Sequence, residues 1–245
     1  MTTLRAQPTT TNWAALIEGC ILAGLGAMLL RKTWDGQLPL YIHPRYTTLL
    51  LATSILVLLI GAFRLWQTGE GAQPLRGRLS VYGLLLAPLL LGVLIPAKPA
   101  GSALVDPRQM NNVGRGYTKP SALANDDSTK WTLYDWLFAR YTLKPDEARG
   151  KAVDVVGFVY RDPNGQQTAA DEFYVVRYTL ACCVADRTNV SLPVKWSDAT
   201  TLPNDQWVRV TGKIDLRPGE GPPEFVVTEA RVEAVPQPSE PYLYP

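Results

Sequence analysis

The run TTLLLATSILVLLIGAFRL, from Thr47 to Leu65, decides the character of the first half of this chain. Two apolar runs of similar length flank it, at Trp13–Leu30 and Leu79–Pro96. About 20 helical residues, each rising 1.5 Å, cover a hydrocarbon core of roughly 30 Å. A cleaved signal peptide fits poorly, because Arg5 is the only basic residue before the first run and because two more apolar runs follow it. The sequence therefore predicts three transmembrane helices, at about 13–30, 47–65 and 79–96.

Small residues inside the first run indicate close helix packing. Gly19, Ala23 and Ala27 fall four apart and so share one helix face, and small residues at this spacing let helix backbones approach each other in lipid. Basic residues are divided about equally between alternate loops, so the positive-inside rule assigns no orientation. We expect a multi-pass protein of the cell membrane, with the side of its C-terminal domain undetermined.

Charge divides the chain into two dissimilar halves. Residues 1–120 hold 11 Lys and Arg against 4 Asp and Glu, whereas residues 121–245 hold 13 against 18, so net charges of +7 and −5 sum to +2. The composition, with 47% hydrophobic residues, excludes a disordered polyelectrolyte and a collagen-like repeat. Three cysteines cannot form the framework of a disulfide-rich secreted protein. A basic half suited to lipid is thus joined to an acidic half suited to water.

The second half is predicted to be a small β domain. Residues 97–130 are rich in Pro, Gly, Ser and Asn and predict a linker. Apolar residues at helical spacing predict one short helix over 131–141. Alternating and β-branched stretches predict five strands, at 151–160, 172–182, 190–196, 206–216 and 224–235. The expected organisation is a transmembrane region over 1–96, a linker over 97–130, a β domain over 131–236 and a Pro- and Tyr-rich tail over 237–245.

Glycines in two of the predicted strands favour a closed barrel. The pattern V-x-V-x-G-x-[VI] occurs twice, with Gly157 and Gly212 at the matching point, where a glycine permits a sharp bend. Five such strands predict a small OB-like barrel, and a fragment of a β-sandwich is the alternative. Many OB folds bind nucleic acid, but a net charge of −5 without a Lys/Arg cluster argues against that partner.

Cys182 and Cys183, within RYTLACCVAD, are the most unusual local feature. Two adjacent thiols are soft ligands that suit a thiophilic metal or metalloid, and Asp186 offers a nearby oxygen. Successive side chains of a strand point to opposite faces, so a shared ion requires a bend close to Asp186. The alternative is that two small residues pack at the end of a strand, since Cys is among the most buried residue types.

The common sequence signatures of enzymes are absent. The chain has no CxxC pair, HExxH helix, GxSxG elbow or P-loop. His43, in YIHPR, is the sole imidazole, and no acid–base partner lies near it in sequence. Asp135 and Trp136, in TLYDWL, are accounted for equally well by a functional role or by amphipathic packing. We therefore expect no enzyme activity, no catalytic residue and no cofactor.

The order of several motifs resembles one family, the YcgQ-like bacterial membrane proteins. The motifs are YIHPR at 41–45, LLLGVLIPAKPAGS at 89–102, NNVGRG at 111–116, TLYDWL at 132–137, GKAVDVVGFVY at 150–160 and RYTLACCVAD at 177–186. The resemblance extends from about Trp13 to Val235, and the CC-x-AD element behind membrane spans is its most specific part. It implies a permease subunit that accompanies a multi-span permease of the YraQ-like kind. The positions it draws attention to are His43, Pro44, Arg45, Asp135, Trp136, Cys182, Cys183, Ala185 and Asp186.

These observations lead to two functional hypotheses. The first is an integral membrane accessory subunit of a permease, whose β-barrel docks on or regulates the transporter. Its expected partners are a multi-span permease and the lipid bilayer, and not nucleic acid. The alternative is a membrane-tethered module that binds a metal or metalloid through the vicinal cysteines, Cys182 and Cys183.

Overall fold

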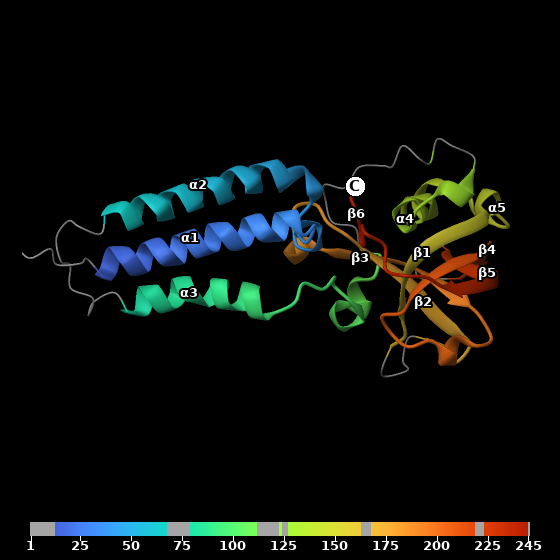
Figure 1. The fold of residues 1–245 in the computed structure, drawn as a ribbon. Helices are drawn as coiled ribbons and strands as arrows, with labels where there is room; N and C mark the ends of the chain where they lie inside the picture. Colours follow the sequence, from blue (N-terminus) through green and yellow to red (C-terminus); the bar gives the residue numbers. More distant parts are fainter. Residues whose placement is uncertain are drawn as a thin grey trace, which may run out of the picture. The chain divides into compact units, whose positions relative to one another are not determined.

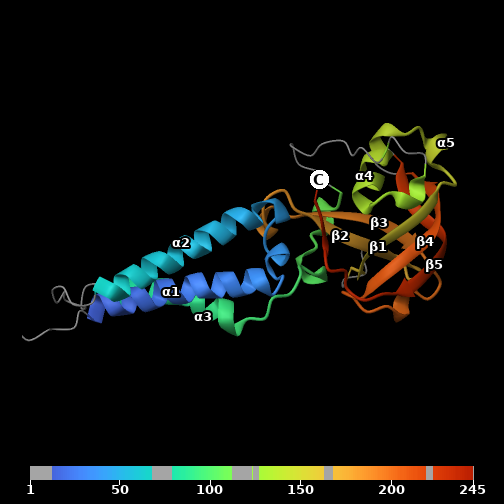
Figure 2. The same ribbon diagram turned by 45° about the horizontal axis from the view of Figure 1, so that its top comes forward.

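The computed structural model of the chain describes residues 13–67, 79–111, 123, 127–162, 168–218 and 223–244. Contacts between residues divide the chain into two compact units, Met1–Lys98 and Pro99–Pro245. The described part of the first unit is helical, and the second unit is built around a β-barrel (Figure 1 and Figure 2).

The first unit contains three helices, α1 (Trp13–Trp34), α2 (Thr47–Trp66) and α3 (Leu79–Leu94). Helix α1 lies between the other two and contacts both (Figure 1). Two short 3-10 helices, Leu38–Leu40 and Pro44–Tyr46, connect α1 to α2. The last turn of α1 is basic, which the negative end of the helix dipole favours.

Two segments of the first unit are long and apolar enough to cross a membrane, Trp13–Trp34 and Pro44–Trp66. They contain the first two predicted spans. The described part of α3 has 16 residues, which at 1.5 Å each give a length of about 24 Å, short of a core of roughly 30 Å. It ends at Leu94 because Pro96 disfavours helical backbone in the residue before it. The third predicted span is therefore present as a helix, but it is not confirmed as a membrane span.

Glycines let α1 and α2 approach closely. A Cβ atom built at Gly26 would lie 2.8 Å from the backbone nitrogen of Leu58. One built at Gly61 would overlap the backbone of Ala23, and one at Gly19 would lie 3.0 Å from the carbonyl oxygen of Gly61. The backbones of the two helices can approach this closely only because these positions lack side chains. Gly19 and Ala23, from the predicted small-residue face, thus lie against α2.

Five strands of the second unit close into a barrel. They are β1 (Ala152–Tyr160), β2 (Glu172–Thr179), β3 (Thr188–Lys195), β4 (Trp207–Arg217) and β5 (Glu224–Ala234). The order around the barrel is β1, β4, β5, β3, β2, and β1 pairs with β2 to complete the ring. All of these pairings are antiparallel except that of β3 with β5. The predicted closed five-stranded barrel is confirmed.

Strand β1 pairs with two neighbouring strands, β4 and β2, and its backbone approaches β2 closely at a glycine. Its first seven residues pair with β4, and Phe158–Tyr160 pair with β2. A Cβ atom built at Gly157 would lie 2.6 Å from the carbonyl oxygen of Val176 on β2. One built at Gly212 on β4 would lie 2.6 Å from the carbonyl oxygen of Thr228 on β5. Both glycines of the predicted pattern therefore lie where a neighbouring strand leaves no room for a side chain.

The β2–β3 connection begins earlier than predicted. Strand β2 ends at Thr179 rather than at Cys182, and β3 begins at Thr188 rather than at Val190. A short 3-10 helix, Val184–Asp186, occupies the connection. The two cysteines consequently lie in a loop and not on a strand.

The barrel core is filled by inward side chains of the strands together with helix α4 (Leu133–Thr142), which packs against β2 and β3 (Figure 1). Trp136 of α4 is fully buried, and its ring meets those of Trp131 and Phe225 edge-on. The predicted short helix is confirmed, although it begins two residues later than expected. A second, four-residue helix, α5 (Pro145–Ala148), follows it.

A second apolar cluster covers the outward face of β1 and β2, on which Phe158 and Tyr178 lie. Ala100, from the range predicted as a linker, belongs to this cluster, and so does Tyr242 from the predicted tail. Tyr242–Leu243 forms a short strand, β6, that pairs in parallel with the end of β2. The backbone N–H of Ala100 donates to the Tyr242 hydroxyl at 2.7 Å. The segment that enters the unit and the tail that ends it are thus bound to each other.

The close approach at Gly61 predicts an intolerance of side chains there. Gly61→Leu places atoms on the backbone of Ala23, so we expect it to separate α1 from α2 and to lower the thermal unfolding midpoint of the detergent-solubilised protein. The cost is about 1–3 kcal/mol for overpacking. Gly83→Leu on α3 is the matched control, because a Cβ there meets nothing within 4 Å. Equal losses for the two variants would contradict this packing.

Candidate functional site

The β2–β3 loop brings three candidate ligands together. The Sγ atoms of Cys182 and Cys183 are 3.7 Å apart, and the ligand atoms of these residues and Asp186 all lie within 4.8 Å of one another. Within the described ranges, this is the one cluster of three His, Cys, Asp or Glu side chains close enough to share an ion. Cys182 is exposed, whereas Cys183 and Asp186 are half-buried. The two sulfurs can lie together because β2 has ended before them, so the opposed directions of strand side chains do not apply.

The carboxylate of Asp186 organises this loop. It accepts hydrogen bonds from the backbone N–H groups of Ala181 at 3.2 Å, Cys182 at 2.7 Å and Cys183 at 3.3 Å. Cys183 is the N-cap of the 3-10 helix, and Asp186 completes a capping box with it. Backbone donors that β2 no longer pairs are therefore satisfied by one side chain.

The same contacts set the protonation of the loop. The Cys182 thiol donates to Asp186 and contacts Cys183, and these interactions raise the pKa of Cys182 to about 11. Partial burial acts to raise the pKa of Asp186, but the hydrogen bonds from Cys182 and from the loop N–H groups outweigh it and lower that pKa. At neutral pH the loop thus holds an ionised carboxylate beside a protonated thiol.

Asp135 and Trp136 lie in α4, at the barrel core. Asp135 is 4% exposed and accepts from the backbone N–H of Thr132 at 2.6 Å and from its hydroxyl at 2.7 Å. The backbone N–H of Asp135 donates to the Thr132 hydroxyl oxygen at 3.3 Å, which completes a capping box. Trp136 is inaccessible to solvent, and its indole Nε1 has no hydrogen-bond partner in the part of the chain that the structure describes. The contacts of these two residues are those of a helix start and a core.

His43 and Arg45 lie in the first unit, next to each other. The Nδ1 atom of His43 accepts the backbone N–H of Arg45 at 3.1 Å and caps the 3-10 helix that leads into α2. The Arg45 guanidinium lies over the ring of Tyr46, 5.1 Å from its centroid. Of the positions singled out in the sequence, the structure thus brings together Cys182, Cys183 and Asp186. It places the other two pairs in α4 and before α2.

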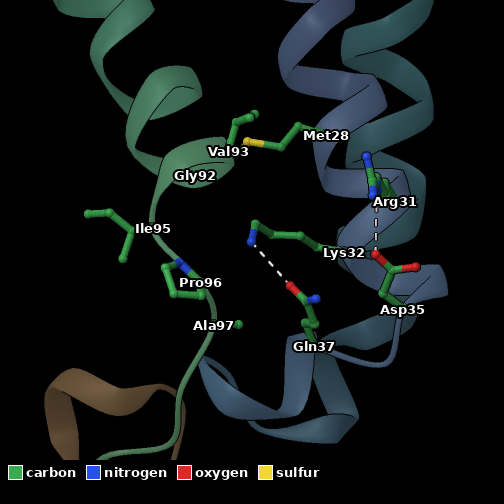
Figure 3. A pocket seen from close by; sticks show the side chains of 10 residues that line it. All are labelled: Met28, Arg31, Lys32, Asp35, Gln37, Gly92, Val93, Ile95, Pro96 and Ala97. Atoms are coloured by element: carbon green, nitrogen blue, oxygen red, sulfur yellow. Dashed lines mark hydrogen bonds and ion pairs between the residues drawn. The ribbon is translucent and has the colours of Figure 1, made fainter.

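A cavity of about 290 Å³ lies in the first unit, between the end of α1 and the end of α3 (Figure 3). Its polar side is paired: Lys32 donates to Gln37 at 3.2 Å, and Arg31 lies 3.5 Å from Asp35. Its apolar side includes Met28 of α1, and the ten lining residues are Met28, Arg31, Lys32, Asp35, Gln37, Gly92, Val93, Ile95, Pro96 and Ala97. Sequence reasoning did not identify this cavity, although a basic pair directly after an apolar run is a signal for a helix end near an interface.

Sequence reasoning also missed Asn111, which completes the edge of β3. Strand β3 meets β5 at one register position, Val194 opposite Val227. Asn111 instead pairs with the β3 backbone: its N–H donates to Asn189 at 3.0 Å, and its Oδ1 accepts the N–H of Ser191 at 2.8 Å. It does so at a φ of 58°, which asparagine tolerates better than most residues.

The capping box of α4 predicts a local, structural loss when Asp135 is changed. Asp135→Ala removes the acceptor of two Thr132 donors, so we expect a loss of about 1–2 kcal/mol in guanidinium unfolding followed by tryptophan fluorescence. Asp146→Ala is the control, because Asp146 lies exposed in the first turn of α5. An unchanged unfolding midpoint for Asp135→Ala would show that the box does not stabilise the fold.

Comparison with known proteins covers both units. The DUF1980 N-terminal domain matches residues 17–111, and the DUF1980 C-terminal domain matches residues 118–245. A Streptococcus mutans protein named "Putative two-component membrane permease complex subunit" is 22% identical over 94% of this chain and 99% of its own length. The Bacillus subtilis UPF0703 protein YcgQ is 22% identical over 59% of this chain and 60% of its own. No solved structure matches.

These matches confirm the resemblance to YcgQ-like proteins. The name of the Streptococcus mutans protein describes a permease subunit rather than an enzyme. The C-terminal domain alone spans more than half of the 245 residues, and the N-terminal domain spans most of the remainder. The chain therefore belongs to the DUF1980 family.

Proposed function

We propose that this chain is a multi-pass membrane subunit of a permease complex, with a water-soluble barrel that docks on or regulates the transporting subunit. The name of the Streptococcus mutans relative supports a place in such a complex. The observation that carries the proposal is the uncovered apolar surface of the first unit, because that surface requires lipid or the helices of another protein.

Helix α2 is apolar on sides that no other described residue covers. Its buried residues are Ser54 and Gly61, and Gly61 faces α1. Its exposed large apolar residues occur on every turn, and they are Leu49, Leu51, Ile55, Leu56, Leu59, Ile60 and Phe63. Soluble monomers rarely expose a contiguous patch of this kind. Lipid can cover one side of this apolar surface, and a partner helix can cover another.

Helix α3 also exposes apolar side chains. Its exposed large apolar residues are Val81, Leu84, Leu86, Leu90, Leu91, Val93 and Leu94. Lipid or the helices of a partner must cover these side chains if the first unit lies in a membrane. We assign the contact with the transporting subunit to α2 and α3.

The barrel is suited to acting through its surface. The cavity beside Trp136 and Phe225 measures about 10 Å³, which is room for one water molecule. Its half of the chain carries 18 acidic and 13 basic residues, a composition that favours water. The core of the barrel is packed with side chains of the strands and of α4, and we assign the barrel a role in binding the transporting subunit or its cargo through its surface.

Photo-crosslinking in native membranes tests the subunit role. A photoreactive residue at Leu56 of α2, which is 57% exposed, or at Leu84 of α3, which is 75% exposed, is expected to trap one multi-span membrane protein. Mass spectrometry identifies the product. The matched control is Leu58 of α2, which lies against Gly26 of α1 and should give crosslinks within the chain. The proposal of a permease complex would be contradicted if both positions crosslinked only to lipid and the purified protein had the mass of a monomer.

A further inference from the structure

We propose that Cys182, Cys183 and Asp186 form a binding site for a thiophilic divalent cation of the Zn²⁺ class, with two sulfurs and one carboxylate oxygen as ligands. The site is a property of the β2–β3 loop and does not rest on the permease role. It would give the barrel a chemical function that its filled interior does not supply.

The separation of the sulfurs fits one ion between them. Two sulfurs bound to a tetrahedral Zn²⁺ at about 2.3 Å each lie about 3.8 Å apart, and the Sγ atoms here are 3.7 Å apart. A carboxylate oxygen at about 2.0 Å from the same ion would lie about 3.5 Å from each sulfur. The ligand atoms of the three residues already lie within 4.8 Å of one another. The two sulfurs thus already match two corners of a tetrahedron, and an Asp186 oxygen lies near a third.

Binding of the cation requires both cysteines as thiolates. The Sγ atom of Cys182 lies 3.7 Å from that of Cys183, and both lie within 4.8 Å of an Asp186 carboxylate oxygen. A cation that binds both sulfurs releases their protons to solvent. The backbone N–H groups that donate to the Asp186 carboxylate can remain hydrogen-bonded to it and so hold it in position.

The same geometry is less suited to a disulfide. Adjacent residues joined by a trans peptide have Cα atoms about 3.8 Å apart, below the usual 4.4–6.8 Å of disulfides. Both cysteines are free thiols in this structure. Sulfur ligands also disfavour hard cations such as Mg²⁺ and Ca²⁺. The sulfur ligands of the loop thus favour a soft or borderline cation, and the distance between the two sulfurs suits one such ion.

Three ligands leave one position of a tetrahedron open. Cys182 is exposed, so the fourth position faces solvent and is available to water or to a ligand from another molecule. Structural zinc sites use four protein ligands, whereas catalytic sites keep one position for water or substrate. The loop thus supplies three ligands and leaves the fourth to a ligand from outside it.

Cadmium titration of the full-length protein in detergent tests the site. We expect a saturable cadmium–thiolate absorption with one ion per chain, competed by Zn²⁺ and unaffected by Mg²⁺ or Ca²⁺. Cys182→Ser together with Cys183→Ser should abolish it, and Asp186→Asn should weaken binding by roughly 10- to 100-fold. Cys20→Ser is the matched control, because Cys20 lies in α1 and belongs to the first unit. It should leave the titration unchanged.

A measurement on the unmodified protein guards against a folding defect in the variants. Cd²⁺ should protect the peptide that carries Cys182 and Cys183 from alkylation, while Cys20 serves as an internal reference whose labelling is unchanged. A titration that survives the double serine variant, or a lack of protection by Cd²⁺, would overturn the proposal. So would loss of the signal in Cys20→Ser alone.

Discussion

Closure of the barrel through β1 is the constraint on which the rest of the second unit depends. Strand β1 pairs with β4 and then with β2, and this requires a close backbone approach at Gly157. Because the ring is closed, inward side chains share one core with Trp136. The outward face of β1 and β2 is also apolar and carries a second cluster. Ala100 and Tyr242 cover that face. The pairing of β2 stops at Thr179, so the cysteine loop begins where the barrel wall ends.

The first unit is held together by a different physical effect. In lipid, burying an apolar side chain against a neighbouring helix gains little, because the hydrocarbon around it is equally apolar. Close backbone approach replaces that driving force, and Gly26 and Gly61 allow it between α1 and α2. The large apolar side chains are left for the surroundings. The two halves of the chain, with net charges of +7 and −5, are thus suited to two different surroundings, lipid for the first and water for the second.

The sequence predicted those features that depend on periodicity. Runs of about 20 apolar residues located α1 and α2, and alternation located all five barrel strands. It could not predict where β2 ends, because the strand pattern was read as continuing to Cys182, whereas the turn depends on hydrogen bonds to Asp186. The roles of Asn111 and Tyr242 also escaped it, since both depend on contacts with strands far away in sequence. The periodicity of the residues predicts helices and strands, whereas the candidate ligands meet in a turn that the Asp186 carboxylate shapes.

The parallel pairing of β6 has a mechanical consequence. Tyr242 binds the backbone of Ala100 at the point where the chain enters the barrel unit, so the entry and exit of the unit are fastened together. The Tyr178 hydroxyl adds a second fastening, because it donates to the carbonyl of Gly101 at 2.9 Å. To pull the entry segment away from the barrel, both hydrogen bonds and the packing of the surrounding aromatic rings would have to break. Residues near the end of the chain therefore help to hold the entry segment against β2.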